Sequence, residues 1–184
     1  VKIDAVGVTL FPSPRLKLSG VRIGELSDSS IAEIRIASPL SLLGKGPYQI
    51  SVVNISGADI AANRFVALPM FMGVASDDSG VAIRKIIIDQ SRITLGDNVA
   101  LGDMYGELAF RADGTIEKAT FETVDRTLLI EALPGNQGVS LNIEGRAWQR
   151  AGTSVSFASL QAKGVLRKDK LLIQNMDTAF LGAI

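Results

Sequence analysis

Apolar residues alternate with polar or small residues along most of this chain, between short polar turns. Val6, Val8 and Leu10 begin the pattern, and further segments follow at 16–23, 34–36, 50–55, 86–95, 105–110, 116–123, 128–133, 139–143, 155–157 and 166–173. Successive side chains of a strand point to opposite faces, so each segment predicts a strand with one apolar face. Because no long helical period separates these segments, they predict a mostly antiparallel meander sheet.

Turn residues and two interruptions refine this prediction. Asp113-Gly114 predicts a hairpin, because glycine adopts a positive φ at little cost. Residues 38–44 (SPLSLLG) have a cap residue, an early proline and a final glycine, and predict a helix of one or two turns. Residues 63–75 predict a second short helix, with a strand as the alternative because Pro69 would bend it. The predicted fold is mainly β: a curved meander sheet, either an open groove or sandwich-like, with one or two short helices.

A loose internal repeat is also visible. Residues 53–60 (VNISGADI) resemble residues 86–93 (IIIDQSRI) and, more weakly, residues 171–179 (LLIQNMDTA). Each copy has an apolar strand, a small polar interruption and a second short apolar run. Such repeats predict a sheet that grows by stacking, with neighbours covering each other's edges. No linker divides the chain, so we expect a single β-rich domain over 1–184, as a fragment of a larger protein.

Composition narrows the function classes. The chain has 184 residues, with 19 basic and 19 acidic side chains and therefore no formal net charge. A protein that neutralises many phosphates usually has a basic excess, so nucleic acid is not an expected partner. The chain has no Cys and no His, which excludes thiolate nucleophiles, disulfides, histidine-containing triads and the usual zinc sites.

The remaining polar groups do not form a recognisable catalytic pattern. Asp77-Asp78, and Asp97 with Asp103, are more typical of solvated turns than of a metal or acid–base site. Ser41 and Lys45 have the spacing of a Ser/Lys dyad, but the predicted helix ends between them at Gly44. Trp148 is expected to anchor a sheet face. We therefore expect a protein that is not an enzyme and has no cofactor or metal.

Residues 6–24 (VGVTLFPSPRLKLSGVRIG) have the pattern of a strand, a proline break and a second strand. They resemble an opening segment of AsmA-like proteins, members of the AsmA/TamB group of Gram-negative cell envelopes. Residues 34–39, 40–46 (LSLLGKG) and 50–60 are similar to the strand, short helix and strand that follow. Residues 108–116, 142–145 with Trp148, and 180–183 resemble its C-terminal repeats, although the last motif here has less glycine than is usual in the family.

The resemblance implies a non-enzymatic role in outer-membrane assembly. Family members are implied to be anchored in the inner membrane with their bulk in the periplasm, and the wider group to conduct lipid acyl chains along grooved sheets. The expected partners are therefore acyl chains of phospholipid or lipopolysaccharide, and envelope proteins. The alternative is a closed β-sandwich adaptor that binds a protein partner through a sheet edge.

Candidate lipid-contact residues follow from their shared alternation phase within each strand. They are Ile86, Ile88, Ile93, Leu95, Leu108, Phe110, Phe121, Leu141, Ile143, Leu171 and Ile173. We also expect the fragment to self-associate, as an edge-mediated homodimer, through an exposed edge at 1–10 or 171–184.

Overall fold

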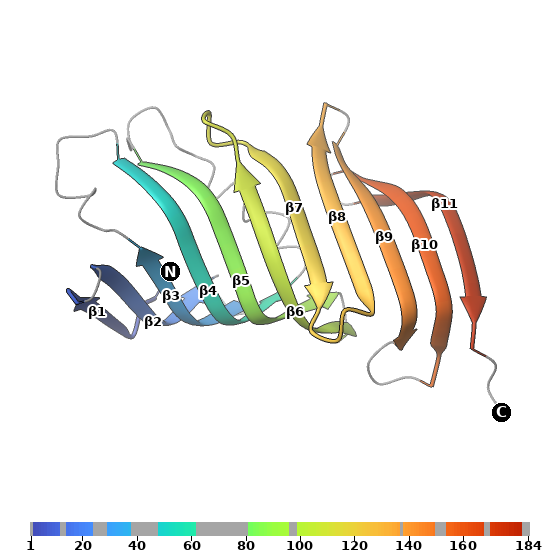
Figure 1. Cartoon of the computed structure of the whole chain (residues 1–184), viewed down its shortest axis with the longest axis horizontal. Coiled ribbons are helices and arrows are strands. Elements are labelled where there is room, and N and C mark those ends of the chain that lie inside the picture. The colour runs from blue at the N-terminus through green and yellow to red at the C-terminus, as the bar shows by residue number, and fades with distance from the viewer. Residues whose placement is uncertain are drawn as a thin grey trace.

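Eleven strands in sequence order form one sheet in the computed structural model of the chain (Figure 1). The structure describes residues 2–11, 14–23, 29–37, 48–61, 81–95, 99–136, 138–149, 154–167 and 170–181. The strands are Ala5–Thr9 (β1), Arg15–Ile23 (β2), Ser29–Ala37 (β3), Tyr48–Ala61 (β4), Val81–Leu95 (β5), Val99–Phe110 (β6), Ile116–Thr123 (β7), Leu128–Gly135 (β8), Gly138–Gln149 (β9), Ser156–Arg167 (β10) and Lys170–Phe180 (β11).

The strand order confirms the predicted meander, with one exception to its direction. Every neighbouring pair is antiparallel except β4 and β5, which are parallel, so the sheet is mixed. A parallel pair needs a crossover of about a dozen residues or more. The intervening residues 62–80 include the segment predicted as a second helix, and they lie outside the described residues.

The predicted helices are not borne out. All the regular structure in the described part of the chain is strand, and residues 38–44 and 63–75 both lie outside it. The sheet is open, because β1 and β11 each have a single neighbouring strand among the described residues. The closed sandwich is therefore wrong. Figure 1 shows that the open sheet is curved, with the first strands passing behind its middle.

The internal repeat has a direct structural counterpart. Its first two copies are the parallel neighbours β4 and β5, paired in the register of the sequence alignment, with Val53 opposite Ile86 and Ile55 opposite Ile88. In both copies the apolar alternation slips by one position, between Ile55 and Ala58 and between Ile88 and Ser91. Two strands with the same slip keep the same face throughout when they are paired in register.

Left-handed backbone explains this slip. Gly57 has φ 62° on β4 and Gln90 has φ 47° on β5, while Gly20 has φ 62° on β2. The flanking register pairs place these residues in one line across β2–β5. After a left-handed residue the alternation of side chains between the two faces shifts by one position. We call this line of irregular backbone across β2–β5 the crease.

The Ser91 side chain satisfies a backbone hydrogen-bond donor at the crease. The Ala58 backbone N–H donates to Ser91 Oγ over 3.2 Å, and Ser91 Oγ donates to the Asp89 carbonyl over 2.9 Å. Both Ala58 and Ser91 are buried. A buried N–H without a partner is costly, so this serine satisfies a donor that the irregular ladder leaves open.

The hydrophobic core lies on the central strands. Its members on β4–β7 are Ile50, Val53, Ile55, Ala58, Ile86, Ile88, Met104, Leu108, Phe110, Ala119 and Phe121. At Gly106 on β6 a Cβ would come within 2.5 Å of the Phe121 ring on β7. Glycine is therefore required there, because the ring lies over its backbone.

Candidate functional site

Two continuous apolar rows cross the whole sheet on one face. Directly opposed residues of neighbouring strands share a face, so the register defines each row. The Ile86 row is Val8, Leu16, Ile36, Val53, Ile86, Leu108, Ala119, Ala132, Leu141, Gly164 and Ile173. The Ile88 row is Val6, Leu18, Ile34, Ile55, Ile88, Gly106, Phe121, Ile130, Ile143, Ala162 and Met176. Each row has one residue per strand and no polar side chain.

A third row lies next to the Ile88 row and contains two buried hydroxyl groups. Its central members include Ala58, Ser91, Met104, Thr123 and Leu128. Thr123 Oγ1 accepts the backbone N–H groups of Thr127 at 3.1 Å and Leu128 at 3.0 Å. Ser91 Oγ is likewise hydrogen-bonded, to the Ala58 N–H and the Asp89 carbonyl. Because both hydroxyl groups have hydrogen-bond partners, they can be buried beside apolar side chains.

The opposite face is polar. Along each strand, a residue that points to the opposite face lies between the members of the Ile86 and Ile88 rows. These residues are Gly7, Lys17, Arg35, Asn54, Ile87, Glu107, Thr120, Glu131, Asn142, Lys163 and Asn175. Lys85 and Glu107 form an ion pair at 2.7 Å, and Lys118 pairs with Glu131. The sheet therefore has one apolar face and one face rich in charged and polar side chains, which we call the charged face although it also includes Ile87, Leu133 and Leu172.

Carboxylates on the polar face and in the turns are stabilised in their charged form. The Lys17 ammonium holds the pKa of Glu33 below its usual value; burial opposes this effect, and the Arg35 guanidinium adds to it. In the β7–β8 turn, hydrogen bonding from the Thr123 and Thr127 side chains lowers the pKa of Asp125. None of these groups lies among the apolar rows.

The structure brings seven of the predicted lipid-contact residues into the two apolar rows. Ile86, Leu108, Leu141 and Ile173 belong to one row. Ile88, Phe121 and Ile143 belong to the other row. Phe110 pairs with Ile116 beyond the Ile86 row and is a core residue. The side chains of Ile93, Leu95 and Leu171 lie outside the described residues.

Accessibility changes strongly along these rows. Ile86 is 1% exposed, and Ile88, Leu108, Phe110 and Phe121 are also buried. Leu141 and Ile143 on β9 are half-buried. Ile173 on β11 is 58% exposed, and at the other end Val6 and Val8 on β1 are each 63% exposed. The central residues are thus core, whereas the ends of the same rows are open surface.

An aromatic cluster borders the open C-terminal part of the apolar face. The Trp148 and Phe157 ring centroids are 5.5 Å apart, and those of Phe157 and Phe180 are 4.9 Å apart. A Cβ on Gly145, which is opposite Leu128 and Leu160, would lie 3.5 Å from Trp148 Cβ. The expected role of Trp148 as a sheet-face anchor agrees with this position.

Sequence reasoning missed two prominent residues of the open surface. Met176 is 53% exposed and Phe180 is 61% exposed, and both lie on β11. The weak third copy of the repeat contained the signal for Met176, because it aligns this residue with Ala58. Phe180 gave no comparable signal, since its neighbours in the cluster come from strands distant in sequence. We call Leu141, Ile143, Ile173, Met176 and Phe180 the C-terminal apolar surface.

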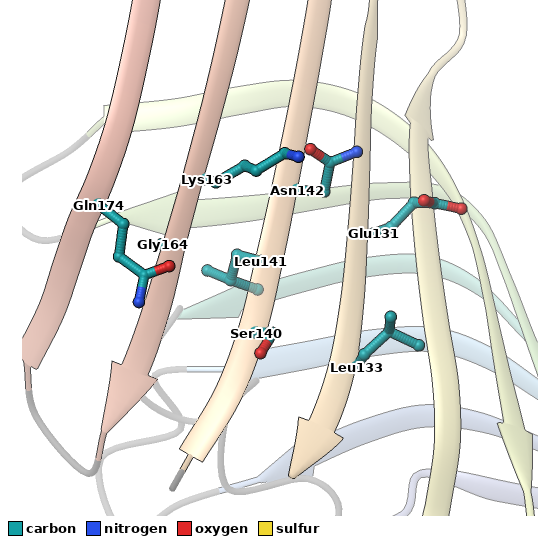
Figure 2. Close-up of a pocket in the computed structure, with 8 residues that line it drawn as sticks. All are labelled: Glu131, Leu133, Ser140, Leu141, Asn142, Lys163, Gly164 and Gln174. Carbon is teal, nitrogen blue, oxygen red and sulfur yellow. The ribbon is translucent and has the colours of Figure 1, made fainter.

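A small pocket lies among β8–β11 (Figure 2). Its volume is about 170 Å³, and its lining residues are Glu131, Leu133, Ser140, Leu141, Asn142, Lys163, Gly164 and Gln174. Pockets for drug-sized ligands are typically about 300–1,000 Å³, so this one is too small for such a ligand. Most of its polar groups belong to the charged face.

Of the other polar candidates, the described part of the chain contains Asp103 alone. Asp103 lies 3.8 Å from Arg92 in an exposed ion pair. Asp77, Asp78, Asp97, Ser41 and Lys45 lie outside the described residues. Within the described ranges no group of three acidic side chains is placed to hold a metal ion.

Among the described residues, no helix has both the length and the apolar character required to cross a membrane.

Comparisons with known proteins add no relative. No protein-family model, curated protein or solved structure matches the chain.

Proposed function

We propose that this sheet binds lipid acyl chains on its apolar face, as a non-enzymatic part of an AsmA-like envelope protein involved in outer-membrane assembly. The observation that carries the proposal is the pair of uninterrupted apolar rows across all eleven strands. A core needs apolar residues only where they are buried. These rows continue onto exposed strands at both ends, where they do not contribute to the core.

The C-terminal apolar surface is the proposed contact site. It offers aliphatic and aromatic side chains on β9 and β11, and the small residues Ala162 and Gly164 of β10 lie between them in the two rows. Each buried methylene gains about 0.8 kcal/mol, so a chain of ~16 carbons gains on the order of 10 kcal/mol when it leaves water completely. Partial burial on an open sheet provides a fraction of this value, which suits a surface that releases lipid as well as binding it.

Periplasmic location and anchoring in the inner membrane belong to the same proposal and rest on the family resemblance. The geometry favours an uncharged hydrocarbon ligand, because the two rows contain no charged or polar side chain. Polar headgroups would remain in water beyond the apolar surface.

Two adjacent residues of β11 provide a matched test. Met176 lies on the apolar face, whereas Asn175 is opposite Lys163 on the charged face, and both are exposed. A photoreactive benzoyl-phenylalanine is introduced at one position or the other. The protein is then mixed with vesicles of phosphatidylethanolamine and phosphatidylglycerol and irradiated, and adducts are measured by mass spectrometry.

We expect a phospholipid adduct from position 176 and little or none from position 175. Since the two probes share a strand and differ only in face, their ratio measures use of the apolar face. Equal labelling at both positions, or no adduct at position 176, would contradict the proposal.

A further inference from the structure

The outer edge of β11 is a long, exposed strand edge. Strand β11 has eleven residues, and β10 is its only strand partner in the described part of the chain. The other sheet edge, β1, has five residues. Protected edges are usually short or carry inward-pointing charges or proline. Strand β11 is neither short nor rich in charge, and Leu172, Ile173, Met176 and Phe180 are all exposed along it.

The two faces of β11 are used symmetrically about the middle of the strand. Lys163 is opposite Asn175 and Gly164 is opposite Ile173, so Gln174 is an extra residue in the ladder. This bulge places Ile173 and Met176 on the apolar face on either side of its centre. Leu172, opposite Val165, and Asp177, opposite Gln161, lie on the charged face in the same symmetric way.

We propose that the chain forms a symmetric dimer in which β11 pairs antiparallel with β11 of a second copy. The two-fold axis passes between Gln174 and Asn175. Ile173 then faces Met176 of the second copy on the apolar side, and Leu172 faces Asp177 of the second copy on the charged side. Only this register keeps both apolar faces on one side and matches the two bulges.

The pairing has the size of a specific contact. An antiparallel pair of eleven-residue strands makes about ten backbone hydrogen bonds, similar to a typical protein interface. The symmetric contact uses the same strand twice and is complete with two copies. A contact between β1 and β11 of another copy would instead be heterologous and could continue into fibres. In the dimer the two apolar rows continue from one copy into the other.

Charge at position 172 provides the first test. Leu172→Glu places a carboxylate opposite Asp177 of the second copy, twice per dimer, whereas Leu172→Lys places an ammonium there. Sedimentation equilibrium of the full 184-residue chain should show a dimer. We expect the dissociation constant of the Glu variant to exceed that of the Lys variant by about tenfold, with a salt-dependent difference.

The outcomes separate this dimer from misfolding and from the lipid proposal. Both substitutions replace the same exposed leucine, so a general loss of stability would affect them alike. Equal dissociation constants, a monomeric wild-type chain or open-ended growth would overturn the dimer. Residue 172 lies on the charged face, so adduct formation at position 176 tests acyl-chain binding separately.

Cysteine pairing tests the register. Because the chain has no cysteine, each introduced thiol is the only one. Directly opposed residues of an antiparallel pair lie about 4.5–5.5 Å apart at Cα, within the range of a disulfide. Ile173→Cys and Met176→Cys proteins should therefore cross-link when mixed and oxidised, and neither should cross-link alone. Cross-linking in a mixture of Val8→Cys and Ile173→Cys, or none in the first mixture, would overturn the proposed register.

Discussion

The central strands and the edge strand β11 contain the same apolar rows in different surroundings. Ile86 on β5 and Ile173 on β11 belong to one row, yet the first is 1% exposed and the second 58% exposed. Both lie in copies of the same repeat, in the apolar run before its polar interruption. An apolar residue at such a position therefore stabilises the fold in the centre of the sheet and offers a contact surface at its edge.

This comparison separates stability from binding. Burial of an isoleucine side chain contributes free energy only to the extent that folding removes it from water. Apolar side chains on β4–β7 leave water when the chain folds, so their burial stabilises the fold. Those on β11 stay largely in water after folding, so most of their burial free energy would be gained only on contact with a ligand or a second copy of the chain.

The largest expected effect comes from truncating one isoleucine side chain in the centre of the sheet and comparing it with one at the edge. Ile86→Ala should lower the free energy of unfolding by about 3 kcal/mol, because it leaves a cavity in the core. Ile173→Ala, in the same row, should change it by less than about 0.5 kcal/mol. Urea unfolding at low protein concentration measures both. Similar losses for the two variants would show that the edge is as well packed as the centre.

A glycine pair sharpens the comparison with a smaller effect. Gly106→Ala should destabilise by about 1–3 kcal/mol, because the added Cβ meets the buried Phe121 ring. Gly7→Ala on β1 should be neutral or slightly stabilising, since a Cβ there has no atom within 4 Å. Adding Phe121→Leu should recover part of the Gly106→Ala loss in thermal unfolding. If the double variant shows no recovery, contact with the ring is not the cause.

Acidification should have the smallest effect, and it acts on the turns and the charged face. Folding lowers the pKa of Asp113, chiefly through the Thr115 hydroxyl, and that of Asp125 through the Thr123 and Thr127 side chains. A carboxyl whose pKa is lower in the folded state stabilises the fold above its unfolded pKa of ~4, and this contribution is lost as pH falls through the folded value.

The melting temperature should therefore be nearly constant between about pH 7 and 5 and decrease below about pH 4. Asp125→Asn should reduce that decrease and slightly lower the melting temperature at pH 7. An unchanged acid profile in this variant would show that the β7–β8 turn does not contribute. The apolar rows contain no titratable group, so acid should not change their order of burial.

The sequence by itself determined the strands, their order and the face that is apolar. Alternation is local, so the segments at 116–123 and 128–133 correspond to β7 and β8, and the Asp113-Gly114 hairpin lies between β6 and β7, where Gly114 has φ 79°. The repeat also contained the crease, because a slip in alternation reflects the backbone conformation of a single residue.

Only the tertiary structure decided which apolar residues are core and which are surface. Burial depends on how far along the sheet a strand lies and on how the sheet curves, and neither is encoded in a strand's own pattern. The parallel pairing of β4 with β5 likewise depends on the path between strands. The open edges follow from the same cause: closure is a property of all eleven strands together, so a period of two predicts a face but not a boundary.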